Sequence, residues 1–110
     1  SGLGVVYKRE LIIPGSVKNI ESYALWGLEG VTEIVFEDGV ESIGDYAVYN
    51  CKYLKKITIP ESVTYIDDVG VGYLDLNEEN VISKDLVIVA KKGSAAEKYA
   101  RDNGFKVENN

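Results

Sequence analysis

The fold of this chain is decided by residues 11–33, LIIPGSVKNIESYALWGLEGVTE, and by the next stretch of equal length, residues 34–56, IVFEDGVESIGDYAVYNCKYLKK. The two stretches align with each other without a gap. Every apolar residue of the first stretch meets an apolar residue in the second, which at a composition of 45% apolar residues would arise by chance with a probability of roughly 10⁻⁴. The matched pairs are Leu11/Ile34, Ile12/Val35, Ile13/Phe36, Val17/Val40, Ile20/Ile43, Tyr23/Tyr46, Ala24/Ala47, Leu25/Val48, Trp26/Tyr49, Leu28/Cys51 and Val31/Leu54.

A third copy begins at residue 57 with ITIPESVTYIDDVGVGY and fades after residue 73. It keeps Ile57, Ile59, Val63, Ile66 and Val71 in phase with the earlier copies. The spacing within one copy predicts a short strand, a turn, a second short strand and a helical turn. Because one copy cannot bury its apolar edge alone, the copies are expected to stack as a solenoid, with equivalent strands in parallel about 4.8 Å apart.

Two segments carry a resemblance to a known family. Residues 57–66 read ITIPESVTYI and residues 47–54 read AVYNCKYL, and this spacing resembles the BspA-like leucine-rich repeat family of bacterial surface proteins. The resemblance covers residues 12–107, although Leu25, Val48 and Val71 stand where the family usually has Phe, and residues 67–85 replace a fourth standard coil by a polar insertion. It implies an α/β leucine-rich-repeat solenoid, wound as a right-handed superhelix, on a secreted or cell-surface protein that serves in adhesion or other protein contact.

The end of the chain predicts a capping helix. After the strand-like Leu86–Val89, Ser94 can accept a hydrogen bond from the Glu97 amide while Glu97 reaches back to the Ser94 amide. The helix should run from Ala95 to about Asn103 and end at Gly104, and Phe105 and Val107 should return as a strand. A helix that covers the open end of the last coil is favoured over a partner-binding helix. Family arrays commonly end in a similar segment.

The chain as a whole is expected to form a single domain over residues 1–110. Its repeats would span about 11–33, 34–56 and 57–85, followed by a cap at about 86–108. Val5 aligns with Leu28 and Cys51, so the first residues resemble the second half of a truncated coil, and Ser1-Gly2 resembles the remnant of a cleaved tag. The chain is therefore expected to be a fragment from the C-terminal end of a longer array.

Composition narrows the function. The chain has no histidine, which excludes Ser-His and Cys-His nucleophilic pairs and histidine-based zinc sites. The net charge of −6 disfavours nucleic acid and anionic membrane surfaces, and no apolar stretch approaches the length of a membrane-spanning helix. No enzymatic activity and no cofactor are expected.

Three possible chemical sites are weighed against simpler interpretations. Cys51 could be a reactive thiol or a metal ligand, but burial beside Leu28 is favoured because no second cysteine or histidine is available. Residues 75–80, DLNEEN, resemble a calcium loop, but Asn80 replaces its glycine and Leu86 its bidentate glutamate, so a solvated loop is favoured. The adjacent pairs Asp67-Asp68 and Glu78-Glu79 do not suit a glycosidase, whose two carboxyls face each other across a cleft.

The better candidate is the outer face of the ladder. If Leu11 and Ile34 point inward, alternation directs Ile12, Val35 and Thr58 outward, with Val87 as their continuation. The flanking charges would be Glu10, Glu33, Lys56 and Asp85. An apolar stripe bordered by charge suits a protein partner, while the alternative is that β-branched residues are there because they suit strands. Tyr53, Tyr65 and Trp26 are secondary candidates, although Trp26 and Tyr49 are expected in the core.

Three functions follow from these features. The first is a non-enzymatic, adhesin-like protein-interaction module at the cell surface or outside the cell. The second is a structural spacer that positions another domain. The third is a carbohydrate-binding accessory unit that uses Tyr and Asp side chains.

Overall fold

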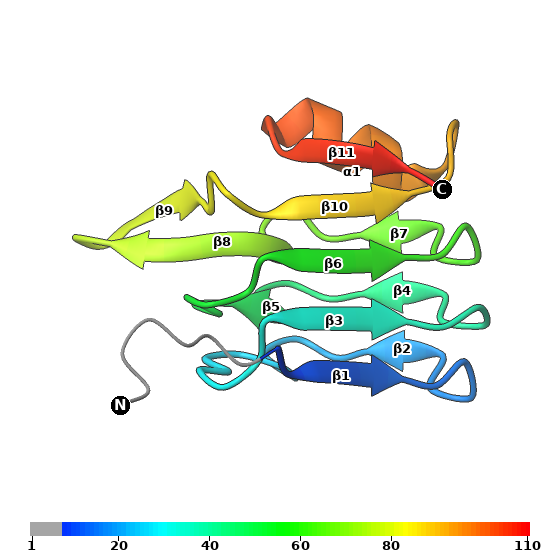
Figure 1. Ribbon diagram of the computed structural model, residues 1–110, viewed down its shortest axis with the longest axis horizontal. Coiled ribbons are helices and arrows are strands. Elements are labelled where there is room, and N and C mark those ends of the chain that lie inside the picture. The colour runs from blue at the N-terminus through cyan, green and yellow to red at the C-terminus, as the bar shows by residue number, and fades with distance from the viewer. Residues whose placement is uncertain (1–7) are drawn as a thin grey trace.

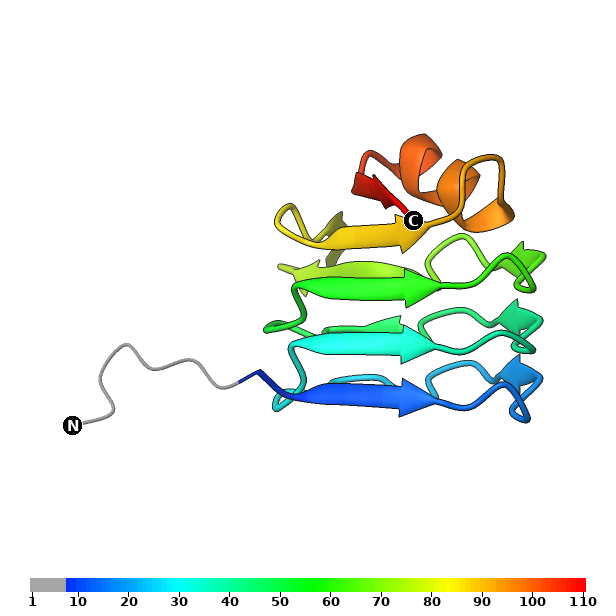
Figure 2. The same ribbon diagram turned by 45° about the vertical axis from the view of Figure 1, so that its right-hand side comes forward.

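The computed structural model describes residues 8–110 as a parallel β-solenoid of about four turns with one short helix near its C-terminal end. Successive coils lie one above another, and each contributes one strand to a long parallel sheet on one side of the stack (Figures 1 and 2). In spatial order, the strands of this sheet are β1 (Glu10–Ile13), β3 (Glu33–Phe36), β6 (Lys56–Ile59), β10 (Val87–Ala90) and β11 (Lys106–Asn109). This sheet is called the main sheet below.

The register of the main sheet confirms the repeat. Leu11 pairs with Ile34, and Ile34 pairs with Ile57, so each step along the sheet is one repeat of the sequence. Ile57 then pairs with Ile88. The third coil is therefore longer than the first two by eight positions, the difference between 88 − 57 and 57 − 34.

Two smaller sheets form the other sides of the coils. One consists of the two-residue parallel strands β2 (Asn19–Ile20), β4 (Ser42–Ile43) and β7 (Tyr65–Ile66). The other consists of β5 (Val48–Tyr49), β8 (Val71–Leu76) and β9 (Glu79–Ile82). All strand pairs in the described part of the solenoid are parallel except β8 with β9.

The prediction of a helical turn within each repeat is wrong. Residues 22–27 form hydrogen-bonded turns, and the matching residues of the next coil include the short strand β5. The reason is that alternate backbone donors bond to the next coil: Tyr23 N–H donates to the Asp45 carbonyl and Leu25 N–H to the Ala47 carbonyl. These donors are thus not available to a carbonyl four residues earlier, which an α-helix requires.

The polar insertion was expected as a solvated loop and is instead a β-hairpin. Strands β8 and β9 pair antiparallel from Tyr73↔Ile82 to Leu76↔Glu79 and project beyond the stack (Figure 1). Asn77 and Glu78, between them, have φ angles of 53° and 66°. Positive φ at both central residues is the geometry of a two-residue turn that suits the twist of a hairpin.

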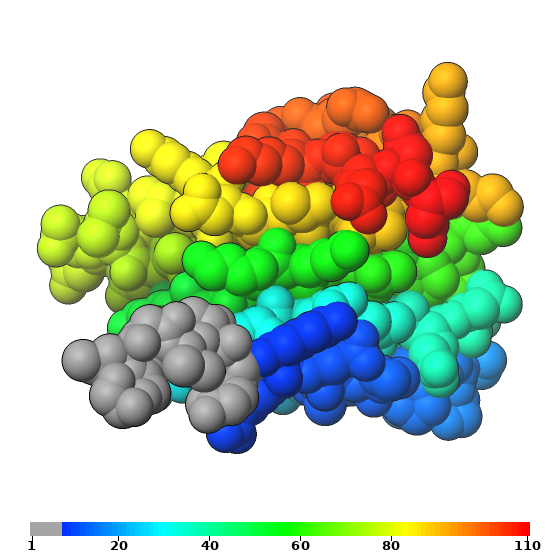
Figure 3. All heavy atoms as spheres, in the orientation of Figure 1, coloured from blue at the N-terminus to red at the C-terminus, as the bar shows by residue number. Residues whose placement is uncertain are grey.

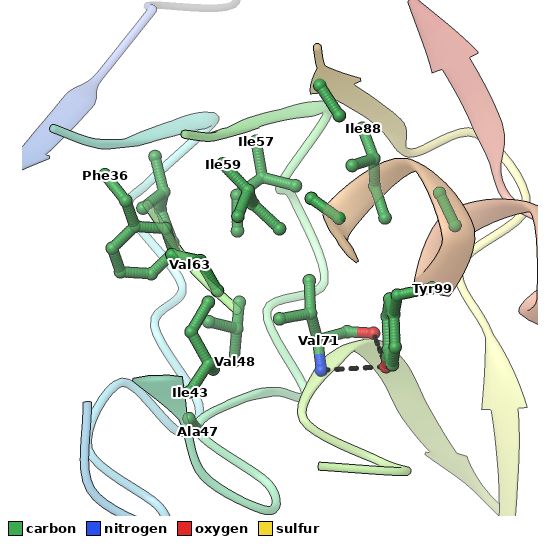
Figure 4. Packing of buried hydrophobic residues seen from close by; sticks show 14 of the residues in the cluster. Phe36, Ile43, Ala47, Val48, Ile57, Ile59, Val63, Val71, Ile88 and Tyr99 are labelled. Atoms are coloured by element: carbon green, nitrogen blue, oxygen red, sulfur yellow. Dashed lines mark hydrogen bonds between the residues drawn. The ribbon is translucent and has the colours of Figure 1, made fainter. Parts of the chain in front are cut away.

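A continuous apolar core runs along the axis of the stack (Figure 4). Val40, Val63, Ile43 and Ile57 are fully buried, whereas Val17, in the first coil, is 39% exposed. No buried side-chain nitrogen or oxygen atom in residues 8–110 is without a hydrogen bond. The coils therefore share one dry interior, as the repeat predicts.

The cap forms largely as expected. Helix α1 (Ala95–Asn103) buries Ala96, Tyr99 and Ala100 and lies over the last coil (Figure 2). Ser94 accepts a hydrogen bond from the Glu97 amide, but the Glu97 carboxylate accepts from Gly93 N–H at 2.9 Å and not from Ser94. Gly104, at φ 84°, ends the helix.

Val5, which the repeat assigns to a truncated first coil, lies outside the described residues. Among residues 8–110 the structure contains no helix that is both long and apolar enough to cross a membrane.

Candidate interaction face

The outer face of the main sheet carries the side chains that alternate with the core. Ile34 and Ile57 are completely buried, while their neighbours Val35 and Thr58 are half-buried on the opposite face. Ile12, at the edge of the sheet, is 50% exposed. Because Ile12 pairs with Val35 and Val35 with Thr58, these three side chains form one row across the strands. This face is directed towards the viewer in Figure 3.

The continuation of that row was assigned to the wrong residue. Thr58 pairs with Val89, which is only 5% exposed, and Val87 pairs with Lys56 instead. Val87 thus lies on the outer face, half-buried, in the row of Glu10, Glu33 and Lys56. The error arose because the third coil, which contains the hairpin, is two residues longer than an alignment of Val87 with Thr58 implies.

The charges beside the row are largely paired with one another. Glu33 Oε1 lies 3.1 Å from Lys8 Nζ, and Lys56 Nζ lies 3.6 Å from Glu108 Oε2. The hydrogen bond and the negative charge of Glu33 raise the pKa of Lys8. Asp85, expected beside Lys56, lies 3.9 Å from Lys106 and is two residues before the strand position that pairs with Lys56. Glu10 is exposed.

Only one of the two tyrosine candidates lies beside this face. Tyr53 is 58% exposed and lines a groove of about 610 Å³ together with Glu33 and Lys56. Tyr65 belongs to β7, in a different sheet, and its hydroxyl donates to Asp67 Oδ1 at 2.6 Å. The structure therefore brings Tyr53, but not Tyr65, together with the outer face of the main sheet.

Trp26 was expected in the core and is 52% exposed, whereas Tyr49, at the same position of the next repeat, is buried as expected. The hairpin explains part of the difference, because the Tyr49 hydroxyl donates to Asn80 Oδ1 of β9 at 2.6 Å. Sequence reasoning also missed a stack of Tyr23 on Tyr46, with ring centroids 5.3 Å apart. The signal was present, since the two tyrosines occupy equivalent positions of successive repeats.

The repeat pattern of this chain matches the model of a known family. The model described as "BspA type Leucine rich repeat region (6 copies)" covers residues 7–83. The chain belongs to the BspA type leucine-rich repeat family. Repeat domains of this family generally act as non-enzymatic scaffolds for protein contact. Neither the curated proteins nor the solved structures include a match to this chain.

In this BspA-type repeat domain, Cys51 is a buried core residue, as favoured from the sequence. It is 4% exposed, and its thiol lies 3.3 Å from the Leu25 carbonyl oxygen, to which it donates. Burial raises the pKa of the Cys51 thiol. A raised pKa keeps the thiol protonated at neutral pH, and the protonated form is a poor nucleophile.

The acidic segments of the BspA-type domain do not converge on one point. Asp75 pairs with Asn80 across the hairpin, so these residues lie on two antiparallel strands and do not wrap around an ion. Asp67 accepts the Tyr65 hydroxyl, and Asp68 lines a separate groove beside α1. Within residues 8–110, no group of three or more acidic or cysteine side chains could hold a metal ion.

Proposed function

We propose that this chain is a non-enzymatic protein-interaction module of a secreted or cell-surface protein, with the outer face of the main sheet as its binding surface. The observation that carries the proposal is the row of Ile12, Val35 and Thr58 across three strands. Apolar side chains that remain partly exposed in a sheet, next to a groove with an exposed aromatic residue, suit a protein partner.

Tyr53 is the aromatic anchor of the proposed surface. Aromatic side chains often contribute a large share of binding energy because they bury much area with few rotatable bonds. The groove beside Tyr53 contains Glu33 and Lys56, whose charges are compensated by Lys8 and Glu108. Paired charges at the border can hold a partner in one orientation without leaving an isolated charge buried. The proposed set is Glu10, Ile12, Glu33, Val35, Lys56, Thr58, Val87 and Tyr53.

Three further expectations belong to this proposal. The chain acts as a single leucine-rich-repeat domain, in an adhesin-like role at the cell surface or outside the cell. The solenoid winds as a right-handed superhelix, because crossovers between parallel strands are right-handed almost without exception. The partner is a protein with an apolar patch that matches the row.

Cross-linking from defined positions tests the proposal. A photo-reactive residue in place of Val35 should capture a discrete protein from a preparation of cell-surface proteins, and one in place of Glu61 should not, because Glu61 lies beyond the sheet. Addition of Ile12→Asp to the variant with the photo-reactive residue at position 35 should abolish capture. It should not change the melting temperature, since Ile12 is half-exposed. Equal capture from both positions, or capture that survives Ile12→Asp, contradicts a binding face and favours a spacer.

A further inference from the structure

A second side of the solenoid carries exposed aromatic rings that the proposed function does not use. Tyr23 is 60% exposed, and its ring stacks on that of Tyr46 with an angle of 6° between the planes. Tyr46 in turn contacts Tyr49 edge to face at 4.9 Å. The stacked rings belong to successive coils, so they form a short aromatic column parallel to the axis of the stack.

A groove of about 190 Å³ lies beside this column. It is lined by Glu21, Ser22, Gly44, Tyr65 and Asp67, among others, and none of its lining residues is basic. Ser22 is followed directly by Tyr23, which joins the groove to the aromatic column. Tyr23, Tyr46, Glu21, Tyr65 and Asp67 are together called the aromatic side.

The repeat determines the spacing of the two carboxylates in the groove. Glu21, Gly44 and Asp67 occupy the same position in three successive coils. Gly44 places no side chain between the acids, and a Cβ atom there would lie 2.8 Å from the Ser22 backbone nitrogen. Two coil spacings of about 4.8 Å separate the acidic positions by about 10 Å, which is also the reach of about three residues of extended peptide.

The chain segments of the two smaller sheets and their hairpin are acidic, while Lys98 of α1 lines a neighbouring groove together with Tyr65 and Asp68. Residues 19–29, 42–51 and 65–82 contain eight of the 18 acidic residues and none of the 12 lysines and arginines. The eight are Glu21, Glu29, Asp45, Asp67, Asp68, Asp75, Glu78 and Glu79. The same segments hold Tyr23, Tyr46 and Tyr65. An aromatic surface in a negative field attracts cations, because the face of an aromatic ring is itself negative.

We propose that the aromatic side binds an extended, arginine-rich segment of a partner protein. One guanidinium lies flat on the Tyr23–Tyr46 column. Two further arginines, three residues apart and on the same face of a segment in the polyproline II conformation, pair with Glu21 and Asp67. Arginine is favoured over lysine because its planar group stacks on an aromatic ring and still donates to a carboxylate. This surface lies on a different side of the coils from the row of Ile12 and Val35, so it is independent of the proposed function.

The test is direct binding of short oligo-arginine and oligo-lysine peptides of equal length, measured by fluorescence anisotropy at physiological ionic strength. The intact chain should bind oligo-arginine more tightly. The double variant Glu21→Gln/Asp67→Asn should weaken that binding by at least about fivefold, and Tyr23→Leu should weaken it by about two- to fivefold. Ile12→Asp should leave it unchanged, which separates this proposal from the proposed function.

The matched control is Glu10→Gln/Glu37→Gln, which also removes two negative charges, from exposed positions on β1 and just after β3. It should weaken binding by less than about twofold, because neither side chain lines the groove and salt screens charges that are farther away. Circular dichroism should show that all variants are folded at the temperature of the binding measurement. Absence of oligo-arginine binding by the intact chain, equal weakening by the two double variants, or no effect of Tyr23→Leu would each overturn the proposal.

Discussion

The hydroxyl of Tyr99 in helix α1 makes two hydrogen bonds to the backbone of a single residue, Val71. It accepts from Val71 N–H at 3.1 Å and donates to the Val71 carbonyl at 2.8 Å (Figure 4). Val71 is fully buried, and it begins the strand that leaves the stack as the hairpin. The cap is therefore joined to the core at the point where the regular repeat ends.

Removal of this hydroxyl should destabilise the protein. Tyr99→Phe keeps the ring but leaves a buried N–H and C=O without partners, which costs about 1–3 kcal/mol. Urea denaturation followed by circular dichroism would measure the change. Burial raises the pKa of Tyr99 well above the usual tyrosine range, so the difference between the two proteins should stay constant from neutral to mildly alkaline pH. An unchanged midpoint in Tyr99→Phe would show that the two bonds contribute nothing to stability.

Two glycines with the same backbone conformation should respond differently to alanine. Gly72 and Gly93 have φ angles of 86° and 83°, but a Cβ on Gly72 would lie 2.6 Å from the ring of Phe105, whereas one on Gly93 meets nothing within 4 Å. Gly93→Ala should cost about 1 kcal/mol from backbone strain alone. Gly72→Ala should cost about 1–3 kcal/mol more, because the added methyl group would overpack the core beside Phe105. Equal melting temperatures would contradict this account.

The stability of the cap should depend on pH through Glu97. Its pKa is lowered by the hydrogen bond from Gly93 N–H, then by the side-chain amide of Asn109. A carboxylate whose pKa is lowered on folding stabilises the native state above its usual value of 4.5, and that contribution is lost as the pH falls through the lowered pKa. The stability advantage of the native chain over Glu97→Gln should therefore be full at pH 7 and shrink in acid. An advantage independent of pH would argue against a charged Glu97.

Cys51 should react slowly with thiol reagents. The thiol is almost completely buried, and its pKa is raised by that burial. The ratio of the labelling rate in native buffer to the rate in denaturant should be about the fraction of time for which the chain is unfolded. For a domain of ordinary stability this ratio is orders of magnitude below one. Mass spectrometry of timed samples measures both rates. Rapid labelling of the native protein would show that the coil opens locally at this site.

The hairpin turn offers a stabilising substitution. Glu78 has a φ of 66°, a conformation that disfavours side chains with a Cβ atom. Glu78→Gly creates an Asn-Gly turn, the preferred sequence for this turn type, and should raise stability by up to about 1 kcal/mol. The comparable change at Asp85, outside the turn, should give no gain. A lower melting temperature for Glu78→Gly would indicate that its side chain makes an unrecognised contact.

Features that recur in the sequence were predictable from it. The parallel ladder, its register at Leu11, Ile34 and Ile57, and the buried position of Cys51 follow from the constant length of the repeat, because stacking requires equivalent residues to coincide. The cap was also predictable, since Ser94 and Gly104 act through local backbone geometry.

Features that occur once, or that depend on the next coil, were not. The hairpin has no second copy to align with, so its length was misjudged and Val87 was placed in the row that Val89 occupies. The helical turns were wrong because donors such as Tyr23 N–H bond between coils, which a pattern within one repeat does not reveal. Trp26 lacks the cover that Asn80 gives to Tyr49, and that cover also comes from the hairpin.

The additional residues of the third coil leave the stack and return to it with Ile57 and Ile88 still side by side. The main sheet thus continues undisturbed through an insertion, because β8 and β9 pair with each other and β8 also pairs with β5 of the preceding coil. In such an architecture the size and chemistry of one protruding hairpin can change while the main sheet stays the same. New specificity can therefore arise in this protein by lengthening or replacing the hairpin, provided that its contacts with Tyr49 and Asn50 of the supporting coil are kept.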